Sequence, residues 1–293
     1  MVTFCLARRG GFKWTNKMKM ARPHFCNLFE KMQEMNSDKK GISLGWAVLF
    51  SVIINIFFNI LSSIGEINGQ PNGEIFHQYN SPFTPADFTF GIWSLIYISY
   101  LVYAAAQLLP TQREKIIYRE LALPFIAVNL LSVAWLYLFS YKLLGLSVLV
   151  IFIMLVLSLL LFHRVRIAKN MHKVSTWLTI PFSLLSGWLS VTFLANLATW
   201  ATNEGNPLSN DAATSMILVA ALAAVIINLR YRDWLYPLVI AWANFGIWSA
   251  NRELNDRVAA VAIGVVFFLV GWSVILFLIR SMRPTRLHDN YYN

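Results

Sequence analysis

The sequence predicts an all-α fold, a polytopic transmembrane helix bundle of about eight spans. Of the 293 residues, 57% are hydrophobic and only 13% are charged, which is about half the charged share of soluble domains. The mean hydropathy is +0.56. The apolar residues gather in long runs, and basic residues concentrate in alternate segments between these runs. This composition argues against a cytosolic enzyme, a nucleic-acid binder and a disordered chain.

The apolar runs set the number of spans. A bilayer core of about 30 Å is crossed by roughly 20 residues of α-helix. Eight runs approach that length, and the seventh is the weakest, because it is short, contains Asn244 and has Pro237 near its start. The expected spans cover residues 44–64, 90–109, 121–140, 143–162, 176–200, 213–229, 235–250 and 258–279.

The basic residues indicate the orientation. With eight spans, 21 of the 24 Lys and Arg fall on one side of the membrane and 3 on the other. The positive-inside rule places the side rich in basic residues, and therefore both termini, in the cytoplasm. The net charge of +10 is thus explained by orientation, and no nucleic-acid partner is expected. We expect residence in the plasma membrane, with an organelle membrane as the alternative.

The two ends of the chain are predicted to be tails. Residues 1–43 are basic and precede the first apolar run, which favours a cytoplasmic tail that meets anionic lipid. A mitochondrial-type presequence is the alternative. Residues 283–293 form the second tail. Both cysteines, Cys5 and Cys26, lie in the first tail, which argues against a disulfide framework.

The spans contain amide side chains and aromatic N–H or O–H groups. No Asp, Glu, Lys, Arg or His lies in the middle of a span, which argues against ion-coupled transport. The sequence predicts no catalytic residues and no metal ligands. Trp, Tyr and Asn instead recur at helical spacing, so that they share faces. These faces are Asn55 with Asn59; Trp93, Tyr97 and Tyr100; Trp135 and Phe139; and Trp188, Thr192 and Asn196.

Such faces are expected to point into the bundle, because an indole or carboxamide in hydrocarbon needs a partner. Helix packing alone is one explanation for each residue. Taken as a set, the faces favour an aromatic-walled cavity suited to a flat or sterol-like hydrophobic ligand.

Three motifs carry a resemblance to a known family. The segment SPFTPADFTFGIWSLIY at residues 81–97 resembles the signature of the TspO/MBR family, which comprises the translocator protein and the tryptophan-rich sensory proteins. WLYLF at residues 135–139 is similar to the family's third-helix motif, and Trp188 and Asn196 have the spacing of its fifth-helix motif. One departure is Thr89, which stands where the family has Phe.

The resemblance implies a TspO-like five-helix core over residues 44–201 and a three-helix C-terminal extension over residues 202–282. It also implies a pocket for a porphyrin, haem or sterol-like ligand under the first long loop. That loop, residues 66–87, would act as a lid, and its Glu74, His77 and Asp87 could meet polar ligand groups. A homodimer is left open. The expected ligand-binding residues are Trp93, Tyr97, Trp135, Phe139, Trp188 and Asn196.

Four function classes remain from the sequence. The leading one is a membrane protein of the sensor or regulator type that binds a small hydrophobic or tetrapyrrole ligand. A facilitative transporter of such a ligand is the second. An enzyme acting on a lipid or porphyrin and a structural subunit of a membrane complex complete the set.

Overall fold

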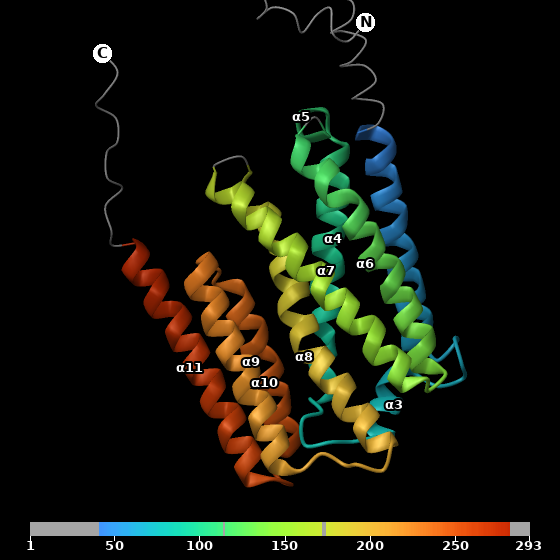
Figure 1. The fold of residues 1–293 in the computed structure, drawn as a ribbon, viewed down its shortest axis with the longest axis vertical. Helices are drawn as coiled ribbons and strands as arrows, with labels where there is room; N and C mark the ends of the chain where they lie inside the picture. The colour runs from blue at the N-terminus through green and yellow to red at the C-terminus, as the bar shows by residue number, and fades with distance from the viewer. Residues whose placement is uncertain (1–40, 114, 172–173, 282–293) are drawn as a thin grey trace, which may run out of the picture.

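Long helices running side by side form the whole of the bundle (Figure 1). The computed structural model describes residues 41–113, 115–171 and 174–281, so the expected tails at 1–43 and 283–293 lie almost entirely outside the described residues. The first helix, Gly41–Ser63, is drawn in blue. The helices that follow are α3 (Asn72–Gln78), η2 (Asp87–Gly91), α4 (Ile92–Leu108), α5 (Pro110–Arg113), α6 (Ile116–Ser140), α7 (Leu144–Asn170), η3 (Thr176–Thr179), α8 (Ile180–Asn203), α9 (Asn210–Tyr231), α10 (Leu235–Asn251) and α11 (Asp256–Ser281).

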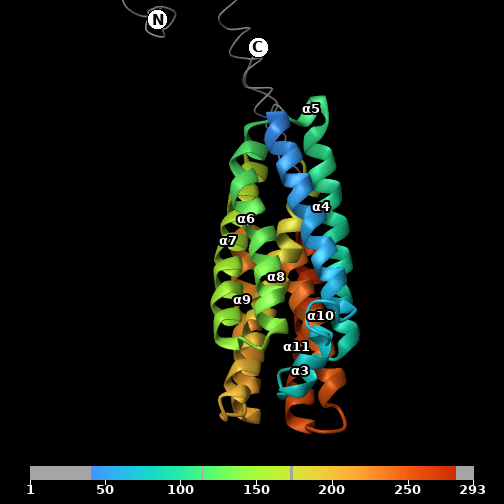
Figure 2. The ribbon, with the colours of Figure 1, turned by 90° about the vertical axis from the view of Figure 1, so that its right-hand side faces the viewer.

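The predicted all-α membrane bundle is confirmed. Seven helices within the described residues are long and apolar enough to span a bilayer. The predicted seventh span corresponds to α10, which has 17 residues and is therefore about 25 Å long. It lies against α8, α9 and α11 and runs along the bundle with them (Figure 2). Both ends of the described chain consequently lie at one end of the bundle, as an even number of crossings requires.

The main difference from the expected spans is at the end of α7. The apolar run ends at Phe162, but the helix continues to Asn170. The added turns carry Arg164, Arg166 and Lys169. Basic side chains are good helix formers, so the helix extends beyond the apolar run toward the membrane surface.

The central helix is α8, the most buried of the membrane-length helices, while α11 is the least buried. Small residues allow α8 to approach its neighbours closely. A Cβ added to Gly187 would lie 2.9 Å from Val239 Cβ on α10, so the absence of a side chain at Gly187 permits this close approach. Hydroxyls along α8 donate to carbonyls of its own preceding turn, as Ser186 Oγ does to Phe182 O at 2.6 Å.

Helix α10 also packs directly against η2 and the residue before it. The Trp242 Nε1–H donates to Thr89 O at 2.9 Å, and the Ala86 N–H donates to Gly246 O at 3.1 Å. The Thr89 side chain is fully buried and lies so close to Gly246 that a Cβ there would overlap it. The small residue at position 89, where the family has Phe, therefore leaves room for α10.

A buried ion pair joins three helices near the end where the termini of the described chain lie. Arg166 of α7 pairs with Asp233, in the turn between α9 and α10, and both side chains are almost completely buried. Ser183 of α8 accepts from Arg166 Nη2 at 2.9 Å and donates to Asp233 Oδ2 at 2.7 Å. Asp233 Oδ1 also accepts from the backbone N–H groups of Leu235 and Tyr236 at the start of α10.

The ion pair generates a stability prediction. Asp233→Asn keeps an oxygen for the α10 amides but leaves Arg166 buried without a counter-charge. Breaking one side of a buried pair costs about 3–5 kcal/mol, so we expect a clear fall in the thermal unfolding temperature in mild detergent. The double variant Arg166→Met/Asp233→Asn should recover part of the loss. An unfolding temperature of Asp233→Asn equal to that of the unmodified chain would contradict this role.

Candidate functional site

A cavity of about 340 Å³ opens near the end of the bundle opposite the termini of the described chain. Its size lies within the range of small-molecule sites. Its walls come from the first helix, the loop with α3, η2, α4, α6, α7 and α8. The lining residues are Asn59, Ser62, Ser63, Pro71, Asn72, Gly73, Phe76, Asp87, Phe90, Trp93, Ser94, Trp135, Leu136, Ile151 and Thr192.

Aromatic rings in mutual contact form one side of the cavity. Trp135 stacks on Phe139 with a centroid distance of 5.1 Å, and Phe139 lies 4.5 Å from Phe76 of α3. Phe76 in turn stacks on Phe90 of η2 at 5.4 Å. These rings come from three elements, and α4 and α5 separate α6 from the other two along the chain, so the wall exists only in the folded chain.

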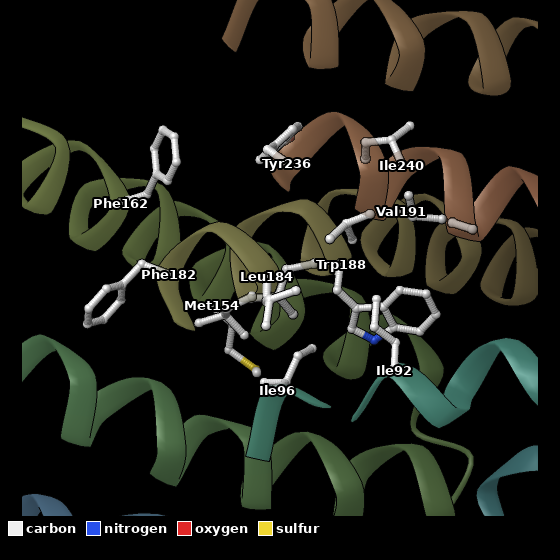
Figure 3. Close-up of a cluster of buried hydrophobic side chains, with 14 of the residues drawn as sticks. Ile92, Ile96, Met154, Phe162, Phe182, Leu184, Trp188, Val191, Tyr236 and Ile240 are labelled. Carbon is white, nitrogen blue, oxygen red and sulfur yellow. The ribbon is translucent and has the colours of Figure 1, made fainter. Parts of the chain in front are cut away.

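The rings continue from Phe90 into the core of the bundle. Phe90 and Trp93 both meet Trp188 edge to face, at 5.9 and 6.3 Å. Trp93 also stacks on Tyr97, one turn further along α4, at 5.5 Å. Figure 3 shows the Trp188 indole beside Ile92 in a cluster of buried hydrophobic side chains. Trp188 therefore supports the rings of the cavity wall from behind.

Three lining side chains carry buried polar atoms with no hydrogen-bond partner among the described residues. They are Ser62 Oγ, Asn72 Nδ2 and Trp135 Nε1. The other polar atom of Asn72 is occupied, because Oδ1 accepts from Ser140 Oγ at 2.7 Å. Buried donors normally find acceptors, and an indole N–H and an amide NH₂ can only donate. These three atoms are therefore the unsatisfied hydrogen-bonding groups of the cavity lining.

The loop between the first helix and α4 covers this cavity. Its short helix α3 inserts Phe76 between Phe139 and Phe90. Asn68 Nδ2 ties the loop to Ser140 O at 2.8 Å. At the mouth, His77 Nε2 and Asp87 Oδ1 lie 2.7 Å apart, and both side chains are exposed. The first long loop therefore has the position of a lid.

The six sequence-predicted site residues fall into three groups. Trp93 and Trp135 line the cavity. Tyr97, Phe139 and Trp188 are buried and make ring contacts with lining residues. The Tyr97 hydroxyl is buried and has no hydrogen-bond partner among the described residues.

Asn196 does not line the cavity and instead links two packed helices. Its Oδ1 accepts from Ser147 Oγ at 2.7 Å, which joins α8 to α7. Thr192, one turn earlier on the same face, reaches the cavity instead.

Several lining residues escaped the sequence prediction. Asn72 and Phe76 lie on α3, a helix of seven residues within the loop, which is too short for apolar periodicity to mark an inward face. Phe90 lies three residues before Trp93, and its single-turn 3-10 helix gives little signal. Asn59 and Thr192 did share faces with other polar or aromatic residues, and this was the signal that could have found them. Within the described residues, no group of three or more His, Cys, Asp and Glu could hold a metal ion.

The fold and cavity define an integral membrane protein of the helical-bundle class with an aromatic-walled site beneath a loop. The model of the TSPO-like protein family matches residues 45–275. This match covers most of the chain, so the chain belongs to the TSPO-like protein family. No curated protein and no solved structure matches it.

The contacts of α3 give a prediction about the lid. Phe76→Ala removes the ring that anchors α3 on Phe139 and Phe90, and loss of a buried Phe costs about 3–5 kcal/mol. We expect hydrogen exchange of the amides in residues 72–78 to accelerate by at least about 10-fold, measured by mass spectrometry in detergent.

The matched control is His77→Ala, on the exposed side of the same helix. An exposed pair such as His77–Asp87 contributes about 0–1 kcal/mol, so exchange should change little. Equal acceleration in both variants would show that Phe76 does not hold the lid.

Proposed function

We propose that this protein binds a small hydrophobic ligand with a hydrogen-bond acceptor in the cavity, and that it acts as a sensor or regulator. The observation that carries the proposal is the combination of Trp93 and Trp135 rings with the unpaired donors of Asn72 and Trp135. Aromatic walls favour a flat apolar body. The donors favour a carbonyl or carboxylate on that body.

A tetrapyrrole is a ligand of this chemistry, since it joins a flat ring to carboxylate side chains. Family membership adds support, because the TspO/MBR proteins that the motifs resemble bind porphyrin, haem or sterol-like ligands. His77 directly follows the lining residue Phe76 on α3, lies at the mouth of the cavity and pairs with Asp87. The proposal therefore rests on ring stacking and hydrogen bonding at the porphyrin edge rather than on a bond to a metal.

Binding is favoured over transport by the packing beyond the cavity. Tyr100 lies 6.2 Å from Tyr97 and 4.8 Å from Phe125, and Tyr103 lies 5.2 Å from Phe182. Tyr100, Phe125, Tyr103 and Phe182 are at most 1% exposed. These rings occupy the bundle between the cavity and its other end, so passage of a ligand would require them to separate.

We further propose that the cavity opens on the non-cytoplasmic side. Basic residues gather at the opposite end of the bundle, at the start of α6 and the ends of α7 and α9. The positive-inside rule assigns that end to the cytoplasm.

Cysteine labelling tests this orientation. In a chain with Cys5→Ser and Cys26→Ser, Asn206→Cys marks the loop at the cavity end and Thr111→Cys marks α5 at the other end. We expect a membrane-impermeant maleimide to label Asn206→Cys on intact cells and Thr111→Cys only after permeabilisation. The reverse pattern would overturn the orientation.

Ligand binding is tested by titrating a porphyrin into the purified full-length protein. We expect saturable quenching of Trp fluorescence. Trp93→Leu removes a ring of the cavity wall and should raise the dissociation constant by about 10-fold, since an aromatic contact contributes about 0.5–1.5 kcal/mol beyond its buried area.

The control variant is Trp46→Phe on the outer side of the first helix, where Trp46 is 48% exposed. Its dissociation constant should equal that of the unmodified chain. Non-saturable quenching, or equal effects of the two substitutions, would contradict the site. Porphyrin flux across proteoliposomes that vanishes with Trp93→Leu would instead identify the facilitative transporter.

A further inference from the structure

A second cavity, of about 350 Å³, lies between the start of α6 and the end of α7. Both of these helix ends are at the end of the bundle where the described chain begins and finishes (Figure 2). It is therefore separate from the aromatic cavity at the other end. Its lining residues are Lys115, Ile116, Ile117, Glu120, Arg164, Ile167, Ala168 and Met171.

Two basic side chains that line this second cavity, Lys115 and Arg164, are available to bind an anion. Lys115 Nζ donates to Gln112 Oε1 at 2.7 Å, and Arg164 Nη1 donates to Glu120 O at 3.2 Å. Both acceptors are neutral, and neither cation has a carboxylate partner within the described part of the chain. The one acid in the lining is Glu120. The two cations thus keep their charge available at a helix–helix groove.

Beside these cations the groove wall is apolar and open to the surroundings. Ile116, Ile167 and Met171 are 68%, 44% and 56% exposed. All three belong to, or directly follow, helices of membrane-spanning length. The cavity therefore has a cationic part next to an apolar face, at the level where a span meets the headgroups. Basic pockets between membrane helices at this level suit lipid headgroups.

We propose that this cavity is a binding site for an anionic phospholipid. The headgroup phosphate lies between Lys115 and Arg164, beside the apolar wall of Ile116, Ile167 and Met171. An acyl chain then runs toward the bilayer interior along Leu123 and Leu160, which are 68% and 49% exposed and lie one turn inward of Glu120 and Arg164. A free phosphate would use only the cations and leave the apolar wall exposed. A zwitterionic lipid would bring its own cation to the same place.

Native mass spectrometry of the full-length protein in mild detergent tests the proposal. Phosphatidylglycerol and phosphatidylcholine with identical acyl chains are added at equal concentration. We expect preferential retention of phosphatidylglycerol. Each cation near a membrane surface contributes about fivefold in affinity, so Lys115→Gln/Arg164→Gln should reduce the preference by about 10-fold or more.

Two control variants separate charge from folding. Arg230→Gln removes an exposed cation at the same end of the bundle, from α9, and should leave the preference unchanged. Arg164→Lys keeps the charge and should retain most of the preference, even if the bond to Glu120 O is lost. Equal retention of both lipids by the unmodified chain, or an unchanged preference in the double glutamine variant, would overturn the proposal. Displacement of the lipid by millimolar inorganic phosphate would also overturn it, because the site would then bind a free anion.

Discussion

The pairing of Arg166 with Asp233 is the constraint on which the arrangement of the helices depends. A buried guanidinium and a buried carboxylate are each costly in a low-dielectric interior, so they must meet, and their helices must be in register for this to happen. The pair fixes α7 against the turn before α10, with Ser183 of α8 between them. Asn228 Nδ2 adds a bond to Asp233 O at 2.6 Å. The helices before and after residue 202 are thus linked by charge at one end and by the contacts of η2 at the other.

The two ends of the bundle are held together by different kinds of contact, and this difference explains why the aromatic cavity can remain open. The end with the ion pair is rigidly cross-linked, and the middle of the bundle is filled by rings such as Tyr100, Tyr103 and Phe125. At the cavity end, the space between the first helix and α6 is covered by the loop that carries the short helix α3, and not by a helix of membrane-spanning length. The seven-residue α3 supplies Asn72 and Phe76 one turn apart, so it covers the space without filling it.

The sequence predicted most of the fold because hydropathy alone identifies helices that must cross a bilayer. A helix occupies each of the eight expected ranges, and seven of these helices are long and apolar enough to span a bilayer. Their ends differ from the expected ones by a few residues except at α7. The candidate site was predicted less completely. Trp93 and Trp135 carry an inward face within a helix, and helical spacing reveals such a face. Asn72 is brought to the cavity by the short helix α3 within the loop. The ion pair of Arg166 with Asp233 joins segments that are 67 residues apart in the chain. No local pattern records either contact.

The position of η2 between the cavity and α10 has a mechanical consequence. One side of this single turn contributes Asp87 and Phe90 to the cavity lining, and the other side is held by Trp242 and Gly246 of α10. Because η2 is only five residues long, the same short stretch of backbone positions Phe90 and meets α10. The cavity wall at Phe90 and the surface on which α10 rests are therefore parts of one rigidly connected segment. Through α10, the wall is in contact with the packing of α9 and α11.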